Sequence, residues 1–247
     1  MLTKICKLAR IAGRSIMKFY YTNKKINFVY KIDQSPITNA DKISHQIIKS
    51  GLTDISPNIP ILSEEDSKTY CKSWNIYWLV DPLDGTKEFL KKNGEFTVNI
   101  SLIEYGKPVL GVIYAPFFNI LYYAFNQQAW KIDEKGYKKE ISVVHSKQPL
   151  FVISRSHLNS KLNIFLEKIK FYKLKELGSS LKFCYVADGQ AQFYPRFGNT
   201  YIWDTAAGHA IVNAAGGSVK IYGTNIDLDY SLSTRKSLIN PYFLVSS

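Results

Sequence analysis

The acidic turn Asp81-Pro82-Leu83-Asp84-Gly85-Thr86 directly follows an apolar run, Tyr77-Trp78-Leu79-Val80, that is typical of a short buried strand. Pro82 fixes its own φ and biases the preceding residue toward an extended conformation, so the chain leaves the strand in one defined direction. Gly85 permits a sharp turn, and Thr86 can begin a helix whose free N–H groups suit a phosphate. The turn therefore predicts two carboxylates and a carbonyl that face one point.

Acids around this turn form an island in a basic chain. Seven acids and three bases lie between Asp54 and Glu88, a local charge of −4, whereas the whole chain of 247 residues carries +12. A second strand, Ile61-Leu62, also runs into acids, at Ser63-Glu64-Glu65-Asp66. Because the ends of strands are where α/β sheets bind ligands, we expect a functional cluster here. Asp66 and Glu88 are the exceptions, since each is expected to be an ordinary solvent-exposed turn residue.

Carboxylates gathered in this way predict a site for divalent metal ions. Like charges a few ångströms apart raise one another's pKa, and a bound dication reverses that effect. Hard oxygen ligands suit Mg²⁺, and two such ions can activate a water and stabilise a leaving oxygen. One more acid is needed. Asp204 provides it at the expected N-terminus of an Ala-rich helix, in Ile202-Trp203-Asp204-Thr205-Ala206-Ala207-Gly208.

The remaining pattern indicates a layered α/β fold. Apolar residues at helical spacing predict an opening amphipathic helix of about five turns. Thr38 is expected to cap a second helix with Asp41 in its first turn. Residues 96–132 are typical of an antiparallel meander. We then expect strand 151–154, helix 160–170, helix 179–188, strand 192–195, helix 203–215 and strand 218–222.

A polar run at residues 133–140 suggests a boundary between two packed lobes. The N-terminal lobe, residues 1–140, would carry most of the expected metal ligands, and the C-terminal lobe, residues 141–247, would carry Asp204. Both would form a single compact catalytic unit.

Composition excludes some classes of protein and leaves others open. With 46% hydrophobic and 21% charged residues, the chain is neither disordered nor fibrous. Its positive charge favours anionic partners such as nucleotides, nucleic acids or acidic membranes. A basic nucleic-acid-binding protein is thus an alternative to an enzyme, although the Lys and Arg residues are scattered instead of clustered with aromatic platforms. Three widely spaced cysteines and a charged N-terminal segment predict a cytoplasmic location.

Three motifs, Ser63-Glu64-Glu65, residues 81–86 and residues 203–208, resemble the signatures of the inositol-monophosphatase superfamily. Members of this superfamily are Mg²⁺-dependent, lithium-sensitive phosphatases. Segments 93–99, 154–157 and 178–184 resemble its bacterial 3′(2′),5′-bisphosphate nucleotidase branch. The resemblance covers essentially the whole chain and implies an αβαβα sandwich.

The same resemblance implies a site for two or three Mg²⁺ ions. Its ligands would be four carboxylates and one carbonyl, from Glu64, Asp81, Leu83, Asp84 and Asp204. Asp81 is expected to bridge two ions. Glu65 matches an acid behind the ligands, while Thr86 and Asp41 match the pair that holds and deprotonates the attacking water.

For the substrate, the resemblance implies adenosine 3′,5′-bisphosphate, hydrolysed to AMP and phosphate as part of sulfur metabolism. The scissile phosphate would lie against the metal ligands and Gly85-Thr86, and no nucleic-acid partner is expected. Contacts to the second phosphate and the adenosine are implied for His157, Ser179, Lys182 and Arg196. An inositol or sugar monophosphatase with the same metal site is the alternative. Peripheral contact with the cytoplasmic side of the inner membrane also remains open.

Overall fold

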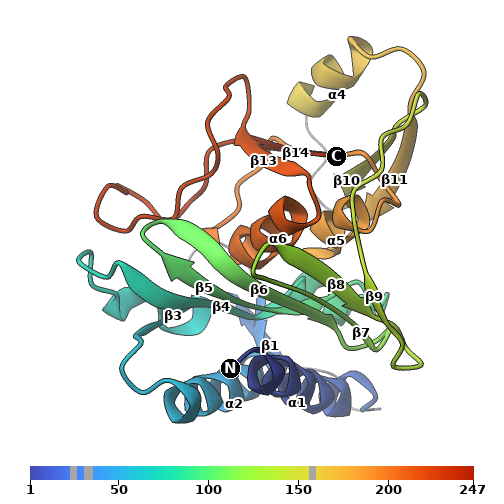
Figure 1. Ribbon diagram of the computed structural model, residues 1–247. Coiled ribbons are helices and arrows are strands. Elements are labelled where there is room, and N and C mark those ends of the chain that lie inside the picture. The colour runs from blue at the N-terminus through green and yellow to red at the C-terminus, as the bar shows by residue number, and fades with distance from the viewer. Residues whose placement is uncertain (23–26, 31–35, 156–159) are drawn as a thin grey trace.

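The computed structural model describes residues 1–22, 27–30, 36–155 and 160–247. Its elements stack in five layers in the order α, β, α, β, α (Figure 1), so the predicted sandwich is confirmed. The helical layers are α1 (Leu2–Tyr20) with α2 (Asn39–Ile55), then α5 (Leu181–Ala187) with α6 (Ile202–Ala214), then α4 (Ser160–Glu167).

A seven-stranded sheet forms the first β layer, in the order β3-β4-β5-β6-β7-β8-β9. Only β3 and β4 are parallel among these strands, and the predicted antiparallel meander is confirmed from β5 to β8. The strands are β3 (Ile61–Ser63), β4 (Ile76–Asp84), β5 (Thr97–Glu104), β6 (Lys107–Ala115), β7 (Ile120–Phe125), β8 (Gln128–Ile132) and β9 (Lys138–Glu140).

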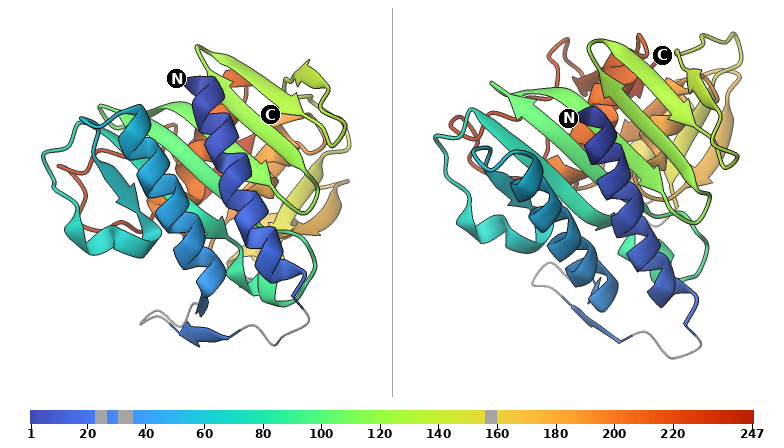
Figure 2. Two further views of the ribbon diagram at one scale, coloured as in Figure 1. Left: turned by 90° about the horizontal axis from the view of Figure 1, so that it is seen from below. Right: turned by 60° about the horizontal axis from the view of Figure 1, so that its bottom comes forward.

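Helices α1 and α2 lie side by side across one face of this sheet (Figure 2). The predicted five-turn helix is α1, which buries Ile5, Leu8 and Ile16 in the core against the sheet. Thr38 caps α2 as expected, because its hydroxyl accepts from the amide of Ala40 and its own amide donates to Asp41 Oδ2 at 2.8 Å. A short hairpin of β1 (Phe28–Tyr30) and β2 (Pro36–Thr38) precedes α2.

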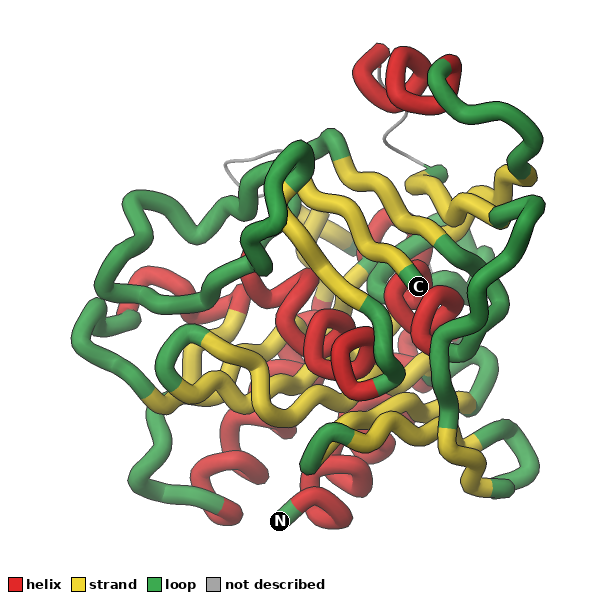
Figure 3. Tube along the Cα trace, turned by 45° about the horizontal axis from the view of Figure 1, so that its top comes forward, coloured by secondary structure: helices red, strands yellow, loops and turns green. Residues whose placement is uncertain are grey.

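The second β layer has five strands, in the order β11-β10-β12-β14-β13. They are β10 (Leu150–Ser154), β11 (Lys173–Leu177), β12 (Phe193–Arg196), β13 (Ser218–Ile221) and β14 (Phe243–Ser246). Strands β11 and β14 were not predicted, and α4 has eight residues, fewer than the predicted helix at residues 160–170. Helix α4 lies at the outer edge of this sheet (Figure 3), where Leu162 and Leu166 pack against Phe151 and Ile153.

Two short helices complete the architecture, the 3₁₀ helix η1 (Glu64–Thr69) and α3 (Thr86–Leu90). The chain passes from one sheet to the other between β9 and β10, yet α6 from the C-terminal half packs on the seven-stranded sheet. The division into lobes at residue 140 therefore stays a prediction. Within the described ranges, no helix combines the length and the apolar character needed to cross a lipid bilayer.

Helix α6 is buried on nearly all sides because both sheets cover it. Its backbone approaches β6 closely at Gly111, where an added Cβ would lie 2.4 Å from the carbonyl oxygen of Ala207 and 2.9 Å from the Cβ of Ala210. Only a residue without a side chain fits between this strand and this helix.

We expect Gly111→Ala to lower stability, since either β6 or α6 must shift to admit the methyl group. Overpacking of this kind costs about 1–3 kcal/mol, which lowers the Tm of a chain of this length by about 2–6 °C. Thermal unfolding measures the effect. Gly198→Ala is the control, because its Cβ would make only ordinary contacts, the nearest at 3.4 Å. Equal Tm values for both variants would contradict this account of the packing.

Candidate active site

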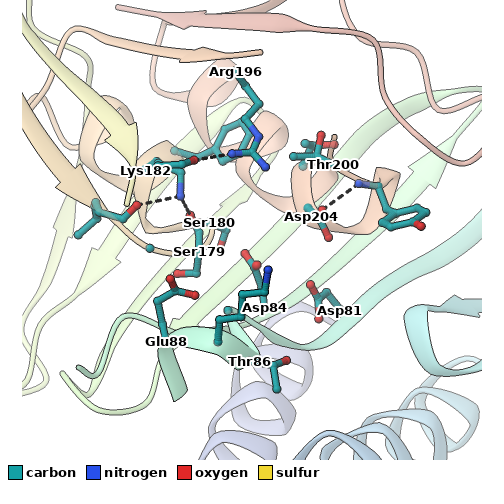
Figure 4. A pocket seen from close by; sticks show the side chains of 18 of the residues that line it. Asp81, Asp84, Thr86, Glu88, Ser179, Ser180, Lys182, Arg196, Thr200 and Asp204 are labelled. Carbon is teal, nitrogen blue, oxygen red and sulfur yellow. Dashed lines mark hydrogen bonds between the residues drawn. The ribbon is translucent and has the colours of Figure 1, made fainter. Parts of the chain in front are cut away.

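Three carboxylates from two distant segments converge between the sheets. Asp81 and Asp84 lie in the last part of β4, and Asp204 lies in the first turn of α6. One oxygen from each lies within 4.8 Å of the others. Figure 4 shows the three side chains facing a common point. The sequence-predicted cluster is therefore brought together by the fold.

An extra residue in β4 allows Asp81 and Asp84 to face the same side. Residues three apart in a regular strand point to opposite faces. Here Asp81 pairs with Asn99 and Asp84 pairs with Thr97, so three steps on β4 match two on β5. The predicted end of the strand at Val80 is wrong, because β4 continues through the bulge to Asp84. The bulge also explains why a proline is tolerated in an interior strand.

Backbone contacts hold each acid in place. Asp81 Oδ1 accepts from the amide of Leu83 at 3.0 Å, and the Ser44 hydroxyl donates to the carbonyl of Pro82 at 2.7 Å. On α6, Asp204 Oδ2 accepts from the amide of Tyr201 at 2.8 Å and so caps the helix that carries it.

The turn after β4 needs glycine. Gly85 has φ +91°, a conformation that residues with a Cβ rarely adopt. An added Cβ would also lie 3.0 Å from the carbonyl oxygen of Glu95. Thr86 then begins α3, as the sequence predicts.

Crowding makes the charged forms of these acids costly. Burial raises the pKa of Asp81 well above its usual range, and Glu64, Asp84 and Asp204 raise it further. The pKa of Asp204 is raised in the same way, first by burial and then by Asp84 and Glu64. Burial also raises the pKa of Asp84, against the opposing effect of Lys182. A divalent cation among these oxygens would compensate all three shifts.

A cavity of about 470 Å³ opens above the acids. Glu64, the three aspartates and Gly85-Thr86 line one side, while Lys182 and Arg196 line the other (Figure 4). Such a pocket has room for a nucleotide-sized ligand. One side is acidic and the other is basic. With a metal cation bound at the acids, a ligand with two anionic groups would meet a cation at each end.

Lys182 is buried in the wall of this cavity on α5. Its ammonium donates to the carbonyl oxygens of Ser179 at 2.6 Å and Leu177 at 3.1 Å. Burial lowers its pKa to about 8, although the charge of Asp84 opposes that shift. An anion placed in the cavity would raise this pKa again, so Lys182 suits a negatively charged group.

Arg196 lies at the end of β12 on the same wall. Nη1 donates to the Ser154 hydroxyl at 2.6 Å, and Nη2 donates to the carbonyl of Asn199 at 2.8 Å. Its buried Nε has no hydrogen-bond partner in the described part of the chain. A buried donor of this kind is costly unless a ligand or water accepts from it.

Thr86 and Asp41 form the pair that the resemblance implies. The Thr86 hydroxyl lies 3.0 Å from Asp41 Oδ1 and 3.3 Å from the carbonyl of Leu83. Burial raises the pKa of Asp41, and the nearby charge of Glu65 adds to the shift. A carboxyl group with a raised pKa is suited to accept a proton relayed through Thr86.

Other sequence expectations fare differently. Glu88 is not a solvent-exposed turn residue, since only 6% of it is exposed and it lines the cavity. The expectation for Asp66 is closer, because its side chain is half-buried and pairs with Lys49 at 2.5 Å. Ser179 lines the cavity as implied, with φ +48°. His157 lies outside the described residues.

Asn99 and Thr97 were missed as parts of the site. Both are buried on β5, and Asn99 Nδ2 donates to Asp84 Oδ2 at 3.4 Å. Asn99 stands in one of the motifs used for the resemblance, but neither its type nor its spacing points to Asp84, the carboxylate three residues after Asp81. The contact forms because the bulge in β4 turns Asp84 to the same face of the sheet as Asn99.

Comparison with known proteins agrees with this geometry. Residues 1–241 match the inositol monophosphatase family. The chain is 63% identical to the 3′(2′),5′-bisphosphate nucleotidase CysQ of Buchnera aphidicola, with 100% of this chain and 94% of that protein covered. It is 52% identical to CysQ of Escherichia coli K12, with 100% and 99% covered. CysQ from Bacteroides thetaiotaomicron has a similar structure, with a TM-score of 0.85, 36% identity, and 99% and 96% of the two chains covered.

The chain belongs to the inositol monophosphatase family, whose members are metal-dependent phosphatases. The family resemblance drawn from the motifs is thus confirmed. The carboxylates, the carbonyl of Leu83 and the compensating charge that the cluster requires all fit a divalent metal ion.

Without metal, protonation should stabilise this fold. Each clustered acid has a higher pKa in the folded state than in the unfolded chain, so the folded state holds more protons above about pH 4. Stability should therefore fall as the pH rises from about 4 through the folded-state pKa values. We expect Asp84→Asn to reduce this loss, measured by urea unfolding in EDTA at about pH 5 and about pH 7.5.

Asp54→Asn is the matched control, since Asp54 is exposed on α2 and outside the cluster. If it flattens the pH dependence as much as Asp84→Asn, the crowding of the site is not the cause.

Proposed function

We propose that this protein is a Mg²⁺-dependent phosphatase that hydrolyses the 3′-phosphate of adenosine 3′,5′-bisphosphate to give AMP and phosphate. The observation that carries the proposal is the cavity itself, which has a cluster of carboxylates on one side and two buried cations on the other. A substrate with two phosphates can satisfy both sides at once. The relatives named as 3′(2′),5′-bisphosphate nucleotidases support this choice of substrate.

Mg²⁺ would be held by Glu64, Asp81, the carbonyl of Leu83, Asp84 and Asp204, and when bound it supplies an activated water and charge neutralisation for phosphoryl transfer. Two or three ions are proposed, as the resemblance implies. The chain's own task is then to place the scissile phosphate at the acids and to orient the attacking water. Gly85 and the N-terminus of α3 present backbone to that phosphate without a side chain in the way.

Thr86 and Asp41 would handle the proton of the attacking water. The Thr86 hydroxyl can accept from the water while donating to Asp41 Oδ1, and Asp41 is the buried acceptor at the end of this path. Glu65 contributes negative charge behind Asp41, which makes Asp41 a stronger base.

Lys182 and Arg196 would bind the phosphate that does not react. Both are buried cations in the wall opposite the acids, and a cation suits a phosphate that does not react. Ser179 and His157 would contact the same end of the nucleotide. A binding site for a second phosphate favours bisphosphates over inositol or sugar monophosphates, which remain the competing substrates.

Phosphate release from a panel of substrates tests this function. We expect adenosine 3′,5′-bisphosphate to be hydrolysed with Mg²⁺ at a kcat/KM at least about tenfold above that for inositol 1-phosphate or fructose 1,6-bisphosphate, and we expect lithium to inhibit it. EDTA should abolish the reaction. Preference for inositol 1-phosphate would replace the proposed substrate with the competing one, and no phosphate release from any substrate would overturn the proposal.

Lys182→Ala should separate the two phosphates of the substrate. Losing a charged hydrogen bond costs about 1.5–3 kcal/mol, so the KM for the bisphosphate should rise about 10- to 100-fold. The KM for a monophosphate hydrolysed by the same enzyme should change far less. Steady-state kinetics on both substrates measure the difference.

Lys175→Ala provides the control, because Lys175 is exposed on β11 and bonds to Tyr185 outside the cavity. Equal changes in KM for both substrates of the Lys182→Ala variant would show that Lys182 does not recognise the second phosphate.

A further inference from the structure

We propose that Asn99 is a positioning residue for Asp84, and that Ser180 supports the Asn99 amide in the orientation this task requires by donating to its oxygen. This inference rests on the proposed function, because it concerns how one metal ligand of that site is held. Asn99 is not among the residues that line the cavity, whereas Ser180 lines it next to Ser179; each would act on the metal site through Asp84.

The proposal begins with a row of buried polar side chains beneath the acids. Thr97, Asn99 and Ser180 are each no more than 2% exposed. Thr97 and Asn99 lie on the same face of β5, and Ser180 comes from the other half of the chain, immediately before α5. Buried polar groups are costly unless they are paired, so a row like this needs a defined pattern of donors and acceptors.

The hydrogen bonds along this row of side chains all run in one direction, from donor to acceptor toward Asp84. Asn99 Nδ2 donates to Asp84 Oδ2 at 3.4 Å, which leaves Asn99 Oδ1 facing Ser180 as an acceptor. Ser180 Oγ has a single proton, and it donates that proton to Asn99 Oδ1 at 2.7 Å. The hydroxyl of Thr97, 2.7 Å from Ser180 Oγ, must then be the donor in that contact. The chain of hydrogen bonds thus runs from Thr97 through Ser180 and Asn99 and ends on the Asp84 carboxylate.

This direction matters for a metal ligand. If the Asn99 amide turned over, its oxygen would face the Asp84 carboxylate and repel it. The carboxylate only accepts hydrogen bonds, so it selects the orientation in which Nδ2 faces it, and the Ser180 hydroxyl supports that orientation by donating to Asn99 Oδ1. Ser180 also donates its backbone amide to Asp84. Asp84 is therefore held from two sides, by the Asn99 side chain and by the Ser180 backbone.

The chain of hydrogen bonds from Thr97 to Asp84 also connects the two sides of the cavity. Ser180 lies between Ser179, whose carbonyl accepts from Lys182, and the helix α5 that carries Lys182. A disturbance at Ser180 would thus reach both the acid cluster and the cation opposite it. Asn99 contacts only the acid side, so its loss should weaken metal binding and turnover without a comparable loss of substrate affinity.

The test compares Mg²⁺ binding in Asn99→Ala, Ser180→Ala and the wild-type protein by isothermal titration calorimetry. Partners that orient metal ligands typically contribute about 10- to 100-fold to metal affinity or activity. We expect Asn99→Ala to raise the Kd for Mg²⁺ about tenfold and to lower kcat by a similar factor, with the KM for the bisphosphate within about twofold. Ser180→Ala should also raise the Kd for Mg²⁺. In the double variant, the loss of Mg²⁺ binding free energy should be smaller than the sum of the losses in the two single variants, because both residues act through one chain of hydrogen bonds.

Ser101→Ala is the matched control. Ser101 lies on the same strand and face, is equally buried, and donates to the carbonyl of Leu110 at 2.7 Å, away from the acids. It should leave the Kd for Mg²⁺ unchanged. A wild-type Kd in Asn99→Ala, or an equal loss in Ser101→Ala, would overturn the inference. Should Asn99→Ala fail to fold, Thr97→Val against Thr97→Ser asks the same question, because only the first removes the donor.

Calorimetry separates this inference from the proposed function. If the wild-type protein binds Mg²⁺ but hydrolyses no bisphosphate, the proposed function fails while the Kd series still decides the role of Asn99. If hydrolysis is confirmed and the Kd series is flat, the positioning role fails alone.

Discussion

One additional residue in β4 determines where the acids of this protein lie. Without it, Asp81 and Asp84 would point to opposite faces of the seven-stranded sheet, one toward α1 and α2 and the other toward α6. With it, both carboxylates face α6, the buried helix of the middle layer, which carries Asp204 in its first turn. The bulge interrupts the regular pairing of β4 with β5. Pro82, whose carbonyl accepts a hydrogen bond from Ser44, holds the bulge in one conformation.

Packing and electrostatics at this point oppose each other. The two sheets enclose α6 tightly enough that Gly111 admits no side chain, so the acid cluster cannot relax by moving apart. Burial then raises the pKa of each clustered acid. Buried carboxylates crowded in this way imply a compensating cation, which is why the site fits the metal-dependent chemistry of its family.

The sequence predicted much of this because the acids follow strongly apolar runs. Tyr77–Val80 and Ile61–Leu62 could be recognised as strands, and both the Thr38 cap and the helix at Asp204 were placed correctly. Strand β11 was missed because its residues are mostly exposed and Lys-rich, with little of the alternation that marks a strand. Glu88 was misplaced because an acid two residues into a short helix is indistinguishable, in sequence, from a surface residue.

The roles of Asn99 and Ser180 could not be predicted for a different reason. Their contacts depend on the bulge register and on a loop more than eighty residues away, and neither leaves a local pattern. Lys182 and Arg196 were named as phosphate contacts only from the family resemblance. Their place in one wall of the cavity, formed by α5 and the end of β12, depends on tertiary structure that the sequence pattern does not reveal.

Anomalous diffraction from crystals soaked in Mn²⁺, a substitute for Mg²⁺ with a measurable anomalous signal, tests the central claim most directly. The account predicts at least one strong peak between the carboxylates of Asp81, Asp84 and Asp204. Crystals that diffract well but show no peak there, or acids that turn away from one another in the soaked protein, would contradict it.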